Sequence, residues 1–187
     1  MGYQRRIATL AVLMILVFLP EMTPAEVPQG AALENGDEYD IKAAFLINFI
    51  RFTEWPGDAF AGPNTPLVLV IFGKDPFGRA AFNEVASKPV NGRRLEIRRT
   101  KNLKDIEGCH FLFINSVDDK ALAAVINTVR NKHVLTVGEG SKFSEAGGMI
   151  RFYIENTNVK FEIKLTEVQH SDLKISANLL NLAKVIR

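Results

Sequence analysis

The sequence predicts a single α/β domain, a three-layer sandwich in which helices cover both faces of a mostly parallel sheet. Continuous apolar runs, which are typical of strands buried on both faces, alternate with segments of helical period over most of the chain. The last third instead carries the signal of a C-terminal β-hairpin. The composition agrees with one packed domain, because the 187 residues include 47% hydrophobic and 24% charged side chains.

Residues 1–25 have the parts of a secretory signal peptide. These parts are a positive start (Arg5 and Arg6), an apolar stretch (Ile7 to Leu19) and small residues before the cleavage point (Thr23-Pro24-Ala25). The apolar stretch is shorter than the roughly 20 residues that span a bilayer. We therefore expect cleavage and export of the mature chain. Residues 26–37 contain Pro and Gly without any period, and we expect them to form a mobile leader.

Residues 38–187 are expected to form the folded domain. Its first element is a helix over residues 38–52, which is apolar on nearly all sides and should be buried. Strands are predicted at Leu67–Phe72, Arg94–Thr100, Phe111–Ile114 and Val134–Val137. Further helices are predicted over Arg79–Ser87, over Leu103–Ile106, and from an aspartate cap at Asp118 or Asp119 to Val129.

Two later strand patterns predict the hairpin. They are Met149–Glu155 and Val159–Leu165, separated by Asn156-Thr157-Asn158. From about Asp172 the chain again has a helical period, with an apolar stripe of Ile175, Leu179, Leu182, Ala183 and Ile186. We therefore predict a final helix beside the hairpin.

Composition and motifs exclude several function classes. Lys and Arg total 23 against 21 Asp and Glu, a net charge of +2 that is too balanced for a nucleic-acid-binding protein. The histidines His110, His133 and His170 stand alone, without the spacing of a metal site. Cys109 and His110 are neighbours on a strand and point to opposite faces, so they cannot form a nucleophile–base pair. The sequence thus predicts no catalytic residue, no cofactor and no metal.

Cys109 is the only cysteine, so it cannot form an internal disulfide even in an oxidising compartment. It begins an apolar run, and free cysteines are among the most buried residues, which predicts a place in the core. An intermolecular disulfide and a reactive nucleophile are the alternatives.

Two glycine-containing loops that follow strands are candidates for phosphate binding. Gly138-Glu139-Gly140-Ser141-Lys142 lacks the spacing of a phosphate-binding loop and contains a carboxylate. Asp75-Pro76-Phe77-Gly78 can present helix N–H groups to an anion. Because Gly and Pro are the ordinary residues of turns, we expect both segments to be structural.

The hairpin and the final helix form the candidate surface for a protein partner. Strand alternation gives the hairpin charged faces beside an apolar helix, a combination that often marks an interface. The candidate contacts are Arg151, Glu162 and Lys174 as polar groups and Phe161 as an apolar anchor. Glu162 has an alternative role as an internal salt-bridge partner of Arg151.

Several motifs occur in a distinctive order along the chain. They are Tyr39–Phe49, Phe52-Thr53-Glu54-Trp55-Pro56, Gly73–Gly78, Cys109–Ile114, Val134–Val137, Gly147–Phe152, Phe161-Glu162-Ile163 and Leu173–Ser176. As an ordered set they resemble the YfiR family of small exported bacterial proteins. The likeness extends from about Tyr39 to Arg187.

The resemblance implies a non-enzymatic periplasmic regulator. The best-known member represses an inner-membrane diguanylate cyclase by binding its periplasmic part, which controls cyclic di-GMP and biofilm growth. An outer-membrane lipoprotein as a second partner and a homodimer are also implied. That member uses disulfides, and this chain departs from the pattern because Cys109 has no partner. From the residues alone, a small-ligand sensor with its cleft at the carboxyl ends of the strands and a hydrolase remain the other function classes.

Overall fold

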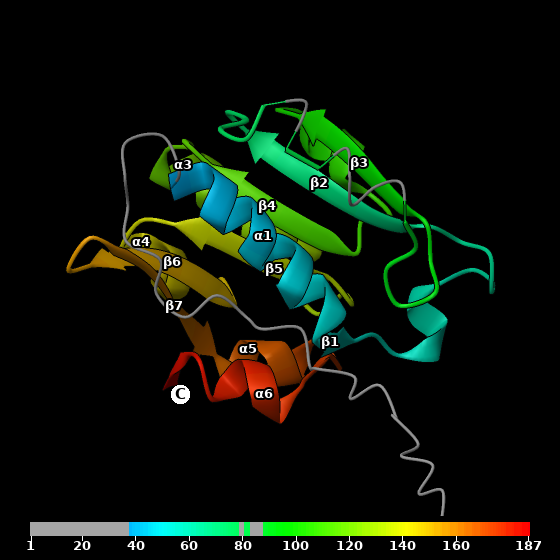
Figure 1. Ribbon diagram of the computed structural model, residues 1–187. Coiled ribbons are helices and arrows are strands. Elements are labelled where there is room, and N and C mark those ends of the chain that lie inside the picture. Colours follow the sequence, from blue (N-terminus) through cyan, green and yellow to red (C-terminus); the bar gives the residue numbers. More distant parts are fainter. Residues whose placement is uncertain (1–37, 79–80, 83–87) are drawn as a thin grey trace, which may run out of the picture.

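The computed structural model describes residues 38–78, 81–82 and 88–187 (Figure 1). The strands are β1 (Thr53–Glu54), β2 (Leu67–Gly73), β3 (Leu95–Thr100), β4 (Phe111–Asn115), β5 (Leu135–Glu139), β6 (Ile150–Glu155), β7 (Asn158–Lys164), β8 (Lys174–Ile175) and β9 (Lys184–Ile186). The α-helices are α1 (Glu38–Arg51), α3 (Asp119–Val129), α4 (Lys142–Glu145), α5 (Leu165–His170) and α6 (Ala177–Leu180), and the 3₁₀ helices are η1 (Gly57–Ala59) and η2 (Leu103–Ile106). The expected signal peptide and leader, and most of the helix predicted over Arg79–Ser87, lie outside the described residues.

The central sheet has seven strands in the order β3-β2-β4-β5-β6-β7-β9. The first five strands in that order are parallel, β7 is antiparallel to β6, and β9 is parallel to β7. β2 and β4 are continuous apolar runs, and their side chains are buried on both faces. The predicted fold class, a mostly parallel α/β sandwich with a C-terminal hairpin, is confirmed.

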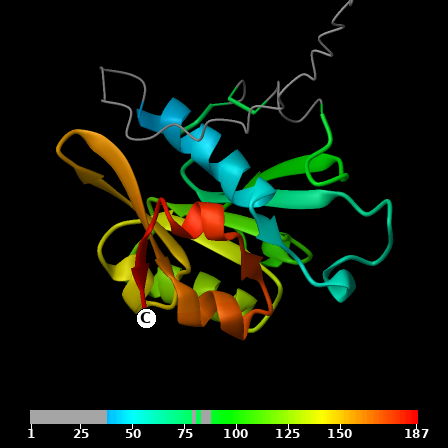
Figure 2. The ribbon, with the colours of Figure 1, turned by 60° about the horizontal axis from the view of Figure 1, so that its bottom comes forward.

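Helices cover both faces of this sheet. α1 crosses one face, and α3 and α4 pack against the other (Figures 1 and 2). Alternation along β2 explains the division. Its residues Leu67, Leu69 and Ile71 join the core under α1, whereas Val68 and Val70 join the core under α3. The sheet therefore separates two hydrophobic cores.

α1 contains one buried charge that its apolar pattern did not predict. Lys42 is 2% exposed, and its ammonium group is bound by Glu38 and, at 3.0 Å, by Oε2 of Glu139. Burial acts to lower the pKa of Lys42, but hydrogen bonds to both carboxylates outweigh burial and raise it. Because Glu139 is the last residue of β5, the ion pair between Lys42 and Glu139 links the first half of α1 to the carboxyl end of a central strand.

The prediction of one long helix after Asp172 is wrong. Asp172 has a positive φ of 54°, which no α-helix contains. Lys174 and Ile175 pair with β1 as β8, Ser176 caps the short helix α6, and Lys184–Ile186 pair with β7 as β9. Pairing with strands that are distant in sequence thus overrides a helical period.

Candidate functional site

The hairpin of β6 and β7 projects from the end of the sheet. β5 pairs with β6 only as far as Phe152, and β9 pairs with β7 only from Glu162 onward. The outer half of the hairpin therefore extends beyond both neighbouring strands (Figure 2). Asn156 and Thr157 have φ angles of 48° and 63°, as the two central residues of a tight hairpin turn require.

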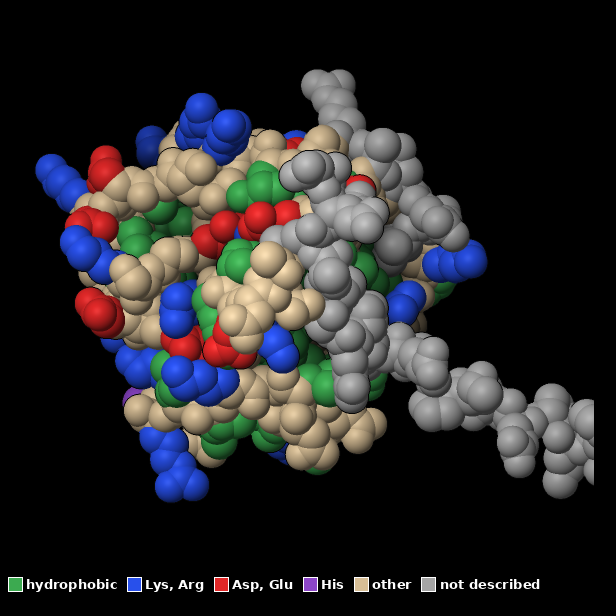
Figure 3. Space-filling view, turned by 60° about the vertical axis from the view of Figure 1, so that its left-hand side comes forward, with side chains coloured by type: hydrophobic (Ala, Val, Ile, Leu, Met, Phe, Trp, Pro, Cys, Tyr) green, Lys and Arg blue, Asp and Glu red, His purple; other side chains and the backbone are tan. Residues whose placement is uncertain are grey.

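The charged side chains of β6, β7 and β9 all lie on the face of these strands that points away from α1. They are Arg151, Glu155, Lys160, Glu162, Lys164 and Lys184. At the alternating positions, Ile150, Phe152, Val159, Phe161 and Ile163 belong to the core under α1, whereas Ile154 and Val185 are exposed. Figure 3, which brings the hairpin side of the molecule forward, shows Lys and Arg side chains interspersed with carboxylates on this side. We call this surface the hairpin face.

Arg151 and Glu162 form a cross-strand ion pair on the hairpin face. Nε of Arg151 donates to Oε1 of Glu162 at 2.8 Å, and the hydroxyl of Ser144 donates to the same oxygen at 2.9 Å. The Glu162 side chain is 7% exposed. The hydrogen bond from Arg151 lowers the pKa of Glu162, with a smaller contribution from Ser144, despite burial. The geometry therefore matches the alternative role of Glu162 as an internal partner of Arg151.

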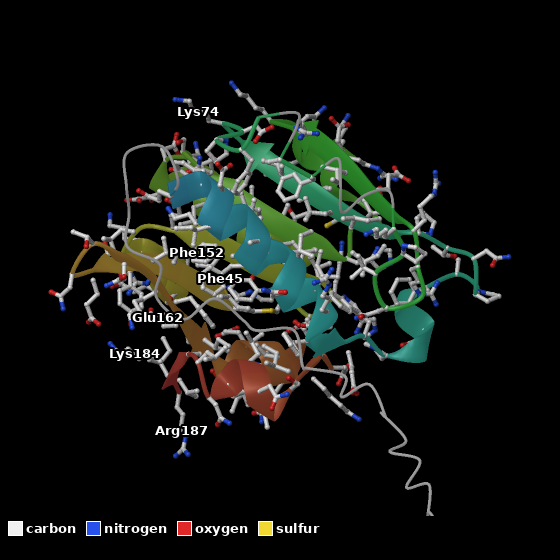
Figure 4. The ribbon with its side chains drawn as sticks, in the orientation of Figure 1. Phe45, Lys74, Phe152, Glu162, Lys184 and Arg187 are labelled. Atoms are coloured by element: carbon white, nitrogen blue, oxygen red, sulfur yellow. The ribbon has the colours of Figure 1, made fainter. Side chains whose placement is uncertain are left out.

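Phe161 is not available as a surface anchor in this structure. It is 3% exposed and lies on the core side of β7, because it neighbours Glu162 and strand alternation sends the two to opposite faces. Its ring packs 4.9 Å from that of Phe49 and 5.4 Å from that of Phe45. Figure 4 shows Phe45 and Phe152 of the same aromatic cluster beneath α1. Phe161 therefore packs the core side of the hairpin against α1.

Lys174 is exposed, but it lies in a different sheet from the other predicted contacts. It pairs with Glu54 in the small sheet of β1 and β8. Its neighbour Leu173 is 3% exposed and belongs to the core under α1. The structure thus brings Arg151 and Glu162 together and separates Phe161 and Lys174 from them.

Three cations of the hairpin face, Lys160, Lys164 and Lys184, were not among the contacts predicted from the sequence. Lys160 lies opposite Tyr153, and Lys184 lies opposite Glu162 on the other side of β7. Figure 4 shows Lys184 beside Glu162, while Arg187 points away from the sheet. Alternation along the hairpin was sufficient to find Lys160. Lys184 was hidden because the sequence pattern placed it in a helix.

A cavity of about 400 Å³ lies at the opposite, amino end of the parallel strands. Asp58, Cys109 and His133 are among its lining residues. Cys109 is 5% exposed, and burial raises the pKa of its thiol to about 12. The predicted buried free thiol is confirmed, and its proton remains bound at neutral pH, which is unsuitable for a nucleophile.

His110, the neighbour of Cys109, has a structural role. The N–H of Val68 donates to its Nδ1 at 3.2 Å, and its Nε2 lies 3.0 Å from the carbonyl oxygen of Ala59. Both ring nitrogens are therefore occupied, with the proton on Nε2. Burial lowers the pKa of this imidazole. The imidazole connects β2 to the turn at η1.

The two glycine-containing loops are structural turns. The ring of Phe143 packs against Gly138 and Gly148, where an added Cβ would approach ring carbons to 2.4 Å and 2.1 Å. In the other loop, the carboxylate of Asp75 accepts the N–H of Phe77 at 2.9 Å, which closes the turn on itself. Glycine at the first loop thus makes room for an aromatic ring.

Residues 38–78, 81–82 and 88–187 contain neither a group of metal-binding side chains nor a membrane-spanning helix. No three His, Cys, Asp or Glu side chains in these ranges are grouped as a metal site requires. No helix in them is long and apolar enough to cross a membrane.

The structure is thus an α/β sandwich whose candidate site is the charged hairpin face. The chain belongs to the YfiR/HmsC-like family, whose profile matches residues 39–184. This family is periplasmic and regulatory rather than catalytic, and at family level it is known for regulation of diguanylate cyclases.

Other comparisons add little to the family match. Among curated proteins, no sequence matches the chain significantly. A conserved domain protein from Vibrio cholerae O1 biovar eltor has a similar crystal structure, with a TM-score of 0.48 and 13% sequence identity. The similarity covers 80% of this chain and 60% of the Vibrio chain, which is therefore matched over less than two thirds of its length.

Proposed function

We propose that this protein is an exported repressor that binds the periplasmic part of an inner-membrane signalling protein, a diguanylate cyclase. Membership of a family of periplasmic regulators, over residues 39–184, is the observation that carries the proposal. Binding would hold the cyclase inactive and lower cyclic di-GMP, which restrains biofilm growth.

The amino-terminal sequence supports this location. Cleavage after Ala25 would release a mature chain beginning at Glu26 into the periplasm, where the periplasmic part of the cyclase lies. Sequestration by an outer-membrane lipoprotein and self-association as a homodimer are parts of the same proposal.

The partner contact is proposed to lie on the hairpin face and the neighbouring C-terminal segment. Arg151 and Lys174 supply polar contacts, since each has part of its side chain at the surface. Glu162 positions Arg151 through the 2.8 Å hydrogen bond, and Phe161 supports the hairpin from the core. Interfaces of this kind use charged groups to set orientation and specificity.

Calorimetric titration tests the proposal directly. The purified mature chain is titrated with the purified periplasmic domain of the diguanylate cyclase from the same cell, and we expect saturable binding. The control is the periplasmic domain of an unrelated membrane protein of the same cell. Lack of binding to every periplasmic cyclase domain that the genome encodes would refute the proposed function.

The cavity near Cys109 favours a second candidate function, sensing of a small ligand. Its volume of about 400 Å³ lies within the range of ligand sites, and its lining combines apolar residues with charged ones such as Asp58 and Lys132. A thermal-shift screen with metabolites tests this function. A ligand that stabilises the wild type and not a variant with the cavity filled, Val134→Phe, would support it.

A further inference from the structure

We propose that the hairpin face recognises an acidic, extended segment of the protein partner that carries carboxylates at alternate positions. The recognition cluster consists of Arg151 and Tyr153 of β6, Lys160 of β7 and Lys184 of β9. The identity of the partner rests on the proposed function, whereas the acidic character of the segment rests on the chemistry of the cluster.

The cluster carries an excess of positive charge. On these three strands the cations are Arg151, Lys160, Lys164 and Lys184, and the carboxylates are Glu155 and Glu162. Lys164 is paired with Glu167 at 3.3 Å. Glu162 is paired with Arg151 and also lies in the field of Lys184, which helps to lower its pKa. The buried carboxylate of Glu162 is therefore the neighbour of two cations, Arg151 and Lys184, and Lys160 is a third cation on the same face. Glu155 lies at the outer end of the hairpin.

Arg151 is positioned to bind a carboxylate through its outer nitrogens. Its Nε is used by Glu162, and no hydrogen bond joins either Nη to another residue in the described part of the chain. The guanidinium lies 5.4 Å from the ring centroid of Tyr153, and the side chain is 20% exposed. Glu162 and Tyr153 thus fix the plane of the guanidinium and leave its two Nη groups without a partner among the described residues. Two such groups of one guanidinium can bind a carboxylate in a bidentate manner.

The spacing of the cluster matches an extended chain. Arg151, Glu162 and Lys184 form one row across the three strands, and Tyr153 and Lys160 form the next row. Rows on one face of a strand are two residues, or about 7 Å, apart. Alternate side chains of an extended segment repeat at the same distance, so carboxylates at positions i and i+2 reach both rows. Contact between the hairpin faces of two copies of this chain is unfavourable, because it would bring cations against Lys160 and Lys184.

Fluorescence polarisation with a defined probe tests the inference without knowledge of the partner. The probe is a labelled ten-residue peptide of alternating Glu and Ser, and its counterpart has Gln in place of Glu. We expect the wild-type mature chain to bind the Glu peptide about tenfold more tightly than the Gln peptide at low ionic strength. The double variant Lys160→Glu/Lys184→Glu should lose about tenfold in affinity for the Glu peptide.

A matched control separates the hairpin face from general charge. Lys101→Glu/Lys104→Glu changes the net charge equally, at the end of β3 and in η2, on the far side of the sheet. This variant should bind the Glu peptide within about twofold of the wild type. Equal affinity of the wild type for the two peptides, or equal losses in the two double variants, would overturn the inference. Tighter binding of the Glu peptide, together with no binding to any cyclase domain, would refute the proposed function but would still support the recognition cluster.

Discussion

Glu162 joins three strands through one buried carboxylate. It accepts hydrogen bonds from Arg151 of β6 and from Ser144 of α4, and Lys184 of β9 lies next to it in the register. Loss of this carboxylate would leave the guanidinium of Arg151 without its partner at a half-buried position. Removal of one member of a buried ion pair is costly for this reason.

Substitution of Glu162 by Ala should therefore lower stability. We expect the free energy of unfolding to fall by about 2–4 kcal/mol, measured by urea denaturation at pH 7. The pKa of Glu162 is lowered by Arg151, so its contribution is present above the unfolded-state pKa and is lost as the pH falls through the lower folded-state value. Glu155→Ala, at the exposed end of the hairpin, is the control and should change stability little. An unchanged unfolding free energy for Glu162→Ala would contradict the structural role.

His110 should make stability depend on pH in a mildly acidic range. Burial lowers its pKa in the folded chain, so below about pH 6.5 the unfolded chain takes up a proton that the folded chain resists. Stability should be complete above that pH and decrease as the pH falls toward the folded-state pKa, by at most about 1.4 kcal/mol per pH unit. His110→Asn does not titrate, and comparison of the two proteins by urea unfolding at pH 7.5 and 5.5 isolates the effect. Parallel pH profiles would show that His110 is not responsible.

At the scale of the element, β5 and the segment before β6 leave room for the ring of Phe143 of α4. This ring lies between Gly138, in β5, and Gly148, just before β6, and each glycine is close enough to exclude a side chain. The sequence indicated a turn at Gly138, but it contained no sign that either glycine leaves room for an aromatic ring. Contacts between residues that are close in space and not in a regular pattern require the fold to be known.

Gly148→Ala should be destabilising, because its Cβ would lie 2.1 Å from Cε1 of Phe143. Overlap of this kind forces the ring or the backbone to move, at a cost of about 1–3 kcal/mol. Gly57→Ala is a suitable control, since nothing lies within 4 Å of an added Cβ there. Thermal unfolding of the two variants measures the difference. If Gly148→Ala melts with the wild type and Gly57→Ala, the close packing of Phe143 is not rigid.

The elements that the sequence predicted well are those with strong local patterns. The buried strands β2 and β4 and the hairpin turn at Asn156 and Thr157 follow directly from apolar runs and turn residues. The C-terminal segment has an equally clear helical spacing, yet Lys174 and Lys184 belong to strands. Their pairing partners in β1 and β7 are supplied by the tertiary fold, which local periodicity does not contain.

At the scale of the whole molecule, the candidate site was likewise predicted only where a local sequence pattern indicated it. The alternation of side chains along the hairpin strands identified Arg151 and Glu162 as charged positions, either in a partner contact or in an ion pair with each other. The same alternation places Phe161, the neighbour of Glu162, on the opposite face, and the prediction of Phe161 as a surface anchor did not take this into account. The net charge of +2 gave no sign of the hairpin face, because a sum over the chain hides charges that the sheet collects on one surface. The fold concentrates these charges at a hairpin that projects beyond the carboxyl end of β5, whereas the buried thiol and the cavity lie at the amino ends of the strands.

The intracellular concentration of cyclic di-GMP tests repression of a cyclase most directly. Cells that lack this gene should contain several times more cyclic di-GMP than wild-type cells, and expression of the wild-type chain should restore the low level. The Lys101→Glu/Lys104→Glu variant should also restore it, whereas Lys160→Glu/Lys184→Glu, exported at the same level, should not. An unchanged cyclic di-GMP concentration in cells that lack the gene, while the cyclase is present, would contradict the account.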